Sequence, residues 1–279
     1  MGCQDKKVDI FIVGFAKSGT TTLGHQLSQH SEIHIPDFEP HFFYSPPNFA
    51  KGYDYYLKSL CKGANGKTFI GEKTPEYVHR QEAIDEIKKN FPNAKIIFIL
   101  REPASRAFSE YLHQFKYGRE KQSFSKVVKY SLDGVGKPPF RPVIERSNYV
   151  DYLKPWYSTF SPEQLFLLTF EEYKSNPQPS LEKIFNFLGV NPSDYVFDNT
   201  IKNKTIVPKF PKLVDNVKKV VGEKVFYGII TPTFRNVGVL KQTIKPKPKD
   251  MERLKEYYSP KVKELETFLN RKFPEWGYK

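Results

Sequence analysis

Short apolar runs alternate with segments of helical period along the first half of the chain. The run from Val8 to Val13 predicts a buried strand. Gly14 to Gly19 interrupts this pattern, and apolar positions return at Leu23 and Leu27 with helical spacing. A second apolar run, within Lys95 to Leu100, is typical of a central parallel strand that is covered on both faces. The order strand, tight loop, helix is therefore the first local structure that the pattern predicts.

The same alternation continues toward the C-terminus. The pattern predicts strands at 68–70 and 165–169, and helices at 81–90, 105–117, 149–160, 180–188 and 250–271. Alternating strands and helices imply an α/β fold with a central parallel sheet flanked by helices. The Lys- and Pro-rich stretch 199–248 is predicted to form loops. Because no internal repeat or linker interrupts the chain, residues 1–279 are predicted to form a single domain.

Composition places the chain among globular proteins. Of its 279 residues, 39% are hydrophobic and 15% aromatic, enough apolar surface to offset the entropy of ordering. No apolar run approaches the roughly 20 residues needed to cross a bilayer, and the N-terminal residues lack the pattern of a secretory signal. Cys3 and Cys61 have neither metal nor redox spacing, which is typical of a reducing compartment without disulfides. We therefore expect a soluble, cytoplasmic protein with no membrane partner.

The charge is strongly basic and unevenly distributed. The chain has 44 Lys and Arg against 31 Asp and Glu, a net +13, and residues 202–279 carry 19 basic and 8 acidic residues, so +11 of the excess lies there. One interpretation is a solvated basic face, and another is a rim that attracts an anionic cofactor. A basic nucleic-acid-binding module, with aromatic side chains as stacking platforms, is the non-enzymatic alternative.

The loop after the first strand has the composition of an anion site. Gly14 to Thr22 contains two glycines, Lys17 and three threonines at a helix N-terminus, where unpaired amides and the helix dipole favour a phosphate. It is P-loop-like but not a Walker A loop, because Thr20 stands where that pattern requires lysine. Arg101 follows the strand that ends at Leu100, where a nucleotide kinase would place an acidic Mg²⁺ ligand. A P-loop-type nucleotide kinase is therefore disfavoured, and Arg101 is interpreted as a second phosphate ligand or as an ion-pair partner of Glu102 or Glu72.

These segments resemble a known family. Lys17 to Thr22 resembles the 5′-phosphosulfate loop of sulfotransferases that use 3′-phosphoadenosine 5′-phosphosulfate (PAPS), and Arg101 to Tyr111 is similar to their 3′-phosphate motif. Phe38 to Phe43 and Gly71 to Tyr77 are similar to segments of the heparan sulfate sulfotransferases, and Phe273 to Trp276 is similar to their closing motif. The resemblance implies a metal-independent, PAPS-dependent sulfotransferase whose product is adenosine 3′,5′-bisphosphate.

The resemblance also assigns cofactor-binding residues. They are Lys17, Ser18, Gly19, Thr20, Thr21 and Thr22 at the 5′ end, and Arg101 and Ser109 at the 3′-phosphate. Lys241 and Arg235 are candidates for a basic loop that closes over the nucleotide, with solvated charge as the alternative. Lys17 is in addition a catalytic candidate, because a lysine and oriented amides can stabilise the leaving phosphate without a metal. The six histidines show no convincing metal-binding spacing.

Glu39 and His41 are the candidates for the catalytic base. They stand two residues apart in an aromatic segment, so an extended backbone would place both side chains on one side. A carboxylate or an imidazole can accept the proton of an attacking hydroxyl. The resemblance makes Glu39 the base and His41 a supporting residue, with the reverse assignment and a buried structural pair as alternatives. Lys73 is a further catalytic candidate, positioned by Glu72 or paired with it in a structural salt bridge.

Some features depart from the glycan-modifying relatives. Where the 3-O-sulfotransferases follow the two phenylalanines with an acidic residue, this chain has Tyr44. Their Golgi anchor and C-terminal cystine loop are also not found in this sequence. We therefore expect a bacterial-type cytoplasmic enzyme that sulfates a hydroxyl, less readily a nitrogen, of a small-molecule or saccharide acceptor, without a nucleic-acid partner.

Overall fold

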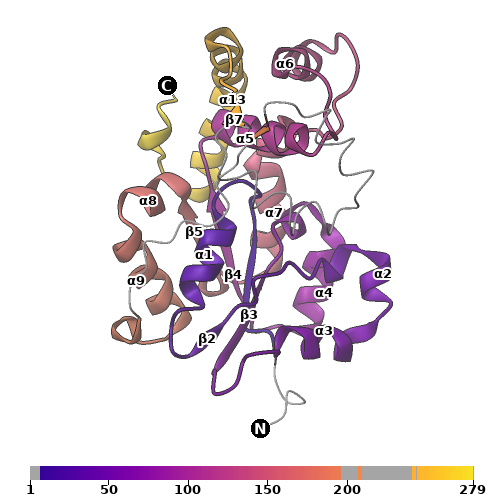
Figure 1. Ribbon diagram of the computed structural model, residues 1–279. Helices are drawn as coiled ribbons and strands as arrows, with labels where there is room; N and C mark the ends of the chain where they lie inside the picture. Colours follow the sequence, from indigo (N-terminus) through magenta and orange to yellow (C-terminus); the bar gives the residue numbers. More distant parts are fainter. Residues whose placement is uncertain (1–6, 196–206, 209–240, 243, 279) are drawn as a thin grey trace. The chain divides into compact units, whose positions relative to one another are not determined.

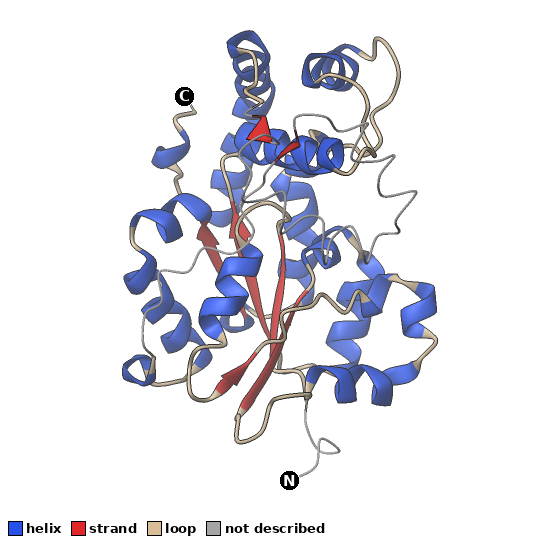
Figure 2. Cartoon of the chain, viewed as in Figure 1, coloured by secondary structure: helices blue, strands red, loops and turns tan. Residues whose placement is uncertain are grey.

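Five parallel strands form the central sheet. The structure is a computed structural model that describes residues 7–195, 207–208, 241–242 and 244–278. The strands are β1 (Ile10–Gly14), β2 (Ile33–His34), β3 (Phe69–Lys73), β4 (Lys95–Leu100) and β5 (Leu165–Thr169), in the spatial order β2-β3-β1-β4-β5 (Figure 2). All pairings within this sheet are parallel, and β1 at its centre is buried over its whole length. The predicted α/β fold with a central parallel sheet is confirmed.

Helices cover both faces of this sheet (Figure 1). Side chains of successive strand residues alternate between the faces. Ile10 and Ile12 belong to a core cluster with residues of α1 (Thr20–Leu27) and α9 (Pro177–Leu188). On the other face, Phe11 lies against Phe91, with 5.6 Å between ring centroids. This second layer includes α3 (Gly52–Leu60), α4 (Gln81–Asn90) and α7 (Tyr149–Thr159).

The chain divides into two compact units. The first comprises residues 1–102 and 149–203 and contains the five-stranded sheet, and the second comprises residues 103–148 and 204–279. The extent of the domain, predicted as 1–279, stays a prediction. The second unit contains α5 (Pro103–Lys116), α6 (Phe124–Asp133), α13 (Pro248–Leu269) and a short antiparallel pair of β6 (Val207–Pro208) and β7 (Lys241–Gln242).

Polar contacts fasten α13 inside the second unit. The hydroxyl of Tyr258 donates to the carbonyl of Ile144 at 2.7 Å, and Ser125 donates to the carboxylate of Asp250 at 2.6 Å. The remaining short elements of the described chain are α2 (Pro46–Phe49), α8 (Phe170–Ser175), and 3₁₀ turns η2 (Phe42–Tyr44), η3 (Pro75–His79), η4 (Glu145–Ser147), η5 (Pro162–Gln164), η6 (Pro192–Asp194) and η9 (Pro274–Trp276).

Several predicted boundaries agree with the structure. The bounds of α4, β4 and β5 are as predicted, and α9 ends at Leu188, followed by Gly189 in a left-handed backbone conformation with φ 79°. Strand β3 is longer than the predicted 68–70, and α3 and α6 were not predicted. The pair β6 and β7 lies where only loops were expected.

Two further observations bear on the environment of the protein. Cys61, which follows α3, is disulfide-bonded, so the expectation of a chain without disulfides is wrong. Among the described residues, no helix combines the length and the apolar character that crossing a membrane requires.

Candidate active site

The candidate residues of the first unit follow the carboxyl ends of its parallel strands. Strand β1 ends at Gly14 and leads into the predicted phosphate loop, β3 ends with Lys73, β4 is followed by Arg101, and β5 is followed by Phe170. Ligands of open α/β sheets bind at this edge. The topology therefore gathers at one edge several residues that lie far apart in the sequence.

Backbone contacts shape the loop between β1 and α1. The amide of Phe15 donates to the carbonyl of Ile99 on β4 at 2.8 Å, and the amide of Ser18 donates to Phe15 at 3.1 Å. Lys17 and Gly19 have positive φ values of 73° and 98°, a conformation in which successive amides can form an anion-binding concavity. The helix that begins at Thr20 has no side-chain cap at its N-terminus, the end at which backbone amides point out of a helix. The loop thus has the backbone geometry of an anion site.

A buried hydroxyl in this loop also lacks a partner. Ser18 is fully buried, and its Oγ makes no hydrogen bond within the described part of the chain. An unsatisfied buried donor costs about 1–3 kcal/mol. An anion bound in the loop would offset this cost by accepting the hydrogen bond. The residues present therefore fit the phosphate end of a nucleotide.

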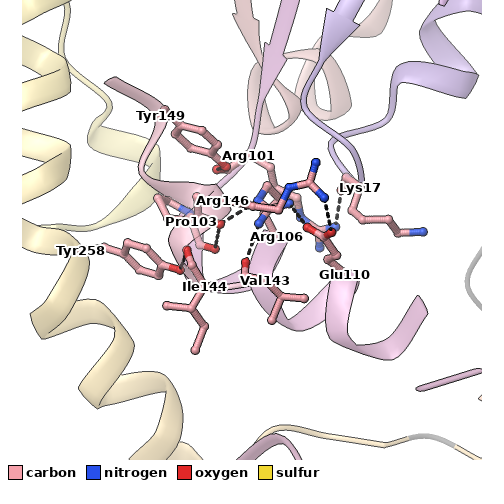
Figure 3. Close-up of polar contacts among 11 residues, drawn as sticks. Lys17, Arg101, Pro103, Arg106, Glu110, Val143, Ile144, Arg146, Tyr149 and Tyr258 are labelled. Carbon is pink, nitrogen blue, oxygen red and sulfur yellow. Dashed lines mark hydrogen bonds and ion pairs between the residues drawn. The ribbon is translucent and has the colours of Figure 1, made fainter. Parts of the chain in front are cut away.

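Arg101 braces the loop (Figure 3). Its Nη1 donates to the carbonyl of Lys17 at 3.1 Å. Its guanidinium lies over the ring of Phe170, 4.9 Å from the centroid. The hydroxyl of Tyr149 donates to the carbonyl of Arg101 at 2.6 Å. Phe170 also lies close enough to Gly19 that a Cβ at this glycine would come within 3.1 Å of the ring. The sequence suggested Arg101, whereas the supporting roles of Phe170 and Tyr149 depend on tertiary packing and were not predicted.

Glu39 and His41 lie side by side in the structure. The His41 Nε2 and Glu39 Oε2 atoms are 3.6 Å apart. The reason differs from the prediction, because His41 has φ 51° and precedes the 3₁₀ turn η2 rather than lying in an extended segment. Burial raises the pKa of Glu39, and the charge of Glu76 raises it further. The charges of Lys73 and Lys17 lower it. The base candidate and the loop lysine therefore act on each other electrostatically.

Lys73 holds the backbone that leads to Glu39. Its side chain is almost fully buried, and Nζ donates to the carbonyls of Pro36, Asp37 and Phe38 at 2.9, 2.7 and 3.4 Å. Burial lowers the pKa of Lys73, while the charge of Glu39 opposes this shift. Lys73 therefore fixes the segment that carries the candidate base.

Glu72 points away from Lys73, so the suggested ion pair between them is wrong. Neighbouring residues of a strand face opposite sides of the sheet. Glu72 is fully buried and accepts hydrogen bonds from the hydroxyls of Tyr56 at 2.5 Å and Thr74 at 3.0 Å. Burial raises its pKa from the ordinary 4.5 to about 7, although these hydrogen bonds lower it.

This raised pKa predicts a pH-dependent stability. Because the folded-state pKa of Glu72 lies above its unfolded value, its stabilising effect is complete below pH 4.5 and is lost as pH rises through about 7. Glu72→Gln cannot ionise at this position. We therefore expect its melting temperature to rise, relative to that of the unsubstituted protein, as the pH increases from 5 to 8. A difference that stays constant over this range, or that moves against the variant, would contradict the assignment.

The second unit carries the other predicted cofactor residues. Ser109 lies half-buried on α5, and Lys241 lies in β7. Arg235 lies outside the described residues. No described contact tests the roles of these residues, so their assignments stay predictions.

A buried ionic cluster supports α5 (Figure 3). Arg106 is fully buried and donates to Glu110 at 2.5 Å, to the hydroxyl of Ser147 at 2.6 Å and to the carbonyl of Val143 at 2.6 Å. Burial alone would raise the pKa of Glu110, but the charges of Arg106 and Arg146 outweigh it and hold the pKa below its usual range. Because these partners accept its hydrogen bonds, the buried Arg106 holds in place α5, the helix that contains Ser109.

The residues of this site define a phosphate-binding α/β protein, and comparison with known proteins identifies its family. The model of the family described as "Sulfotransferase domain" matches residues 7–212. The chain belongs to this family, and the predicted class of enzyme, a sulfotransferase, is confirmed.

Individual relatives agree with this assignment. The chain is 32% identical over 201 residues to the bovine bifunctional heparan sulfate N-deacetylase/N-sulfotransferase 2, an alignment that covers 67% of this chain and 22% of the relative. A sulfotransferase structure from Alicyclobacillus acidocaldarius matches 97% of this chain and 99% of its own, with a TM-score of 0.72 and 24% identity. The mouse sulfotransferase SULT7A1 complexed with PAP matches 92% of this chain and 85% of its own, with a TM-score of 0.51 and 18% identity. The structures establish the fold.

The described residues do not gather into a metal site. No group of three or more His, Cys, Asp or Glu side chains among them could hold a metal ion.

Proposed function

We propose that this protein transfers a sulfuryl group from PAPS to a hydroxyl, less readily a nitrogen, of a small-molecule or saccharide acceptor and releases adenosine 3′,5′-bisphosphate (PAP). The carrying observation is the loop between β1 and α1, in which Lys17 and Gly19 have positive φ values and the buried hydroxyl of Ser18 has no hydrogen-bond partner in the described part of the chain. An anion bound there would meet the loop amides and this hydroxyl. Family membership and the PAP complex of a protein with the same fold support the donor.

The proposed reaction uses the residues as follows. PAPS supplies an activated sulfuryl group. Glu39 accepts the proton of the acceptor hydroxyl while the oxygen of that hydroxyl forms a bond to sulfur. The bond from sulfur to the 5′-phosphate oxygen breaks, and its electron pair stays on that oxygen. Lys17 and the loop amides stabilise the negative charge that grows there. Lys73 acts through the backbone of residues 36–38 by keeping Glu39 in place.

The cofactor is held at both ends in this proposal. The 5′-phosphate end lies in the loop of Lys17, Ser18, Gly19, Thr20, Thr21 and Thr22, where the unpaired Ser18 hydroxyl supports the assignment. Arg101 and Ser109 hold the 3′-phosphate, an assignment that rests on the sequence motif. Lys241 is also assigned to the nucleotide, again on sequence grounds.

The two phosphate sites predict a difference between nucleotides. PAP should raise the melting temperature more than AMP at equal concentration, because AMP leaves the 3′-phosphate site empty. A ligand present at 100 times its Kd stabilises a fold by about 2.7 kcal/mol. Thermal unfolding with each nucleotide, with adenosine as the control that lacks both phosphates, measures this. Equal shifts from PAP and AMP would remove the assignment of Arg101 and Ser109.

The acceptor is the open part of the proposal. A screen of hydroxylated, amino and saccharide compounds with PAPS, followed by mass spectrometry for the addition of one sulfuryl group, tests it directly. Action in the cytoplasm, without nucleic-acid or membrane partners, belongs to the same proposal and rests on the sequence. The disulfide-bonded Cys61 counts against this compartment, where thiols are kept reduced.

A further inference from the structure

A tyrosine hydroxyl extends the Glu39 and His41 pair into a chain of three side chains. The Tyr44 hydroxyl lies 2.8 Å from His41 Nδ1, and His41 Nε2 lies 3.6 Å from Glu39 Oε2. The two rings meet edge to face, with 5.4 Å between centroids and 72° between planes. Each nitrogen of the imidazole therefore faces a different partner.

The identity of these partners determines which nitrogen carries the proton. Burial lowers the pKa of His41, although the charge of Glu76 opposes this, so the neutral ring is favoured. A neutral imidazole has one donor and one acceptor nitrogen, and an ionised carboxylate only accepts. Nε2, which faces Glu39, therefore carries the hydrogen. Nδ1 then accepts the hydrogen bond that the Tyr44 hydroxyl donates.

The Tyr44 ring is held independently of its hydroxyl. The guanidinium of Arg80 lies over the ring, 5.4 Å from its centroid, and the ring of Tyr77 meets it at 6.1 Å. The Tyr77 hydroxyl also accepts from the amides of Phe42 at 2.9 Å and Phe43 at 3.4 Å, the two residues before Tyr44. Removal of the Tyr44 hydroxyl alone should therefore leave the ring in place.

We propose that Tyr44 is a positioning residue that fixes His41 in the Nε2–H tautomer, so that the Nε2–H group faces the Glu39 carboxylate 3.6 Å away and steadies it for the reaction. This inference rests on the proposed sulfuryl transfer. It also decides between the two candidate bases. In this tautomer the single lone pair of the neutral imidazole, on Nδ1, is occupied by Tyr44, so His41 has no nitrogen left to accept a proton from an acceptor, and Glu39 is the base.

Nitrogen NMR of the imidazole tests the tautomer without any need for turnover. The protein is labelled with ¹⁵N-histidine, and the His41 signals are assigned by their loss in His41→Gln. Near neutral pH, the unsubstituted protein should show a protonated Nε2 and an unprotonated Nδ1. In Tyr44→Phe this preference should weaken or reverse, whereas Tyr55→Phe, which removes an exposed hydroxyl elsewhere in the same unit, should leave it unchanged. A protonated Nδ1 in the unsubstituted protein, or the same tautomer in Tyr44→Phe, overturns the proposal.

Kinetics with an acceptor found by the screen supply the second measurement. Tyr44→Phe should lower kcat by about three- to tenfold, the range expected for one lost hydrogen bond. The KM for PAPS should not change, because Tyr44 does not act on the nucleotide. Unchanged kcat with an altered tautomer would overturn the positioning role alone. Failure of the unsubstituted protein to transfer sulfuryl groups would overturn the proposed function, while the NMR result would still report the tautomer.

Discussion

Lys17→Ala is expected to lower kcat about 10²–10³-fold, the usual effect of removing a donor that stabilises a transition state. In the proposed reaction, negative charge grows on the 5′-phosphate oxygen as the bond to sulfur breaks, and the ammonium group responds to that growth. Lys17 already has a positive φ of 73° without being a glycine. Alanine meets the same backbone strain there, so the substitution isolates the effect of the side-chain charge.

A comparison with Arg101→Ala separates chemistry from binding. Arg101 is proposed to hold the 3′-phosphate, which lies away from the reacting bond in ground and transition states alike, so its loss should chiefly raise the KM for PAPS. Arg101 also donates to the Lys17 carbonyl, so a modest fall in kcat is expected as well. Lys62→Ala, which removes an exposed lysine, is the matched control. If Lys17→Ala changed only the KM for PAPS, Lys17 would be a binding residue rather than a catalytic one.

The central strands could be predicted because burial on both faces leaves a continuous apolar run. Strand β4 has this pattern, and its predicted bounds agree with the structure. Strand β3 extends past the predicted 68–70 and ends with Glu72 and Lys73, two charged residues of a kind that is usually exposed. Both are buried because tertiary partners satisfy them: hydroxyls for Glu72, and carbonyls of residues 36–38 for Lys73. No local pattern records such partners.

The candidate site was predictable to a similar degree. The phosphate loop has a local signature, because its glycine, lysine and threonine content and its backbone conformation belong to one short segment. The proximity of Glu39 and His41 was predicted for an extended backbone, whereas in the structure His41 has a left-handed conformation. The contact of Arg101 with Phe170 joins residues from two strand ends, and only the folded sheet brings them together.

Glu39→Gln is expected to slow sulfuryl transfer at least about 10²-fold, the lower range for the loss of a general base. The amide keeps the shape of the side chain but cannot take the proton of the acceptor. Burial raises the pKa of Glu39, which makes its carboxylate a stronger base than an exposed glutamate, and the charges of Lys73 and Lys17 oppose this shift. Steady-state rates with PAPS and an acceptor measure the loss, and Glu82→Gln on the exposed face of α4 is the matched control.

PAP binding distinguishes the possible causes of that loss. Glu39 is not assigned to the nucleotide, so Glu39→Gln should keep the thermal shift that PAP produces, and His41→Ala should be less impaired in transfer than Glu39→Gln. An active Glu39→Gln together with an inactive His41→Ala would pass the role of base to the imidazole. Loss of the PAP shift in Glu39→Gln would instead show that the carboxylate supports the phosphate loop. Such a loss has a physical cause available, because the charges of Lys17 and Glu39 attract each other in the folded protein. The uncharged amide of Glu39→Gln would remove this attraction from the lysine of the loop.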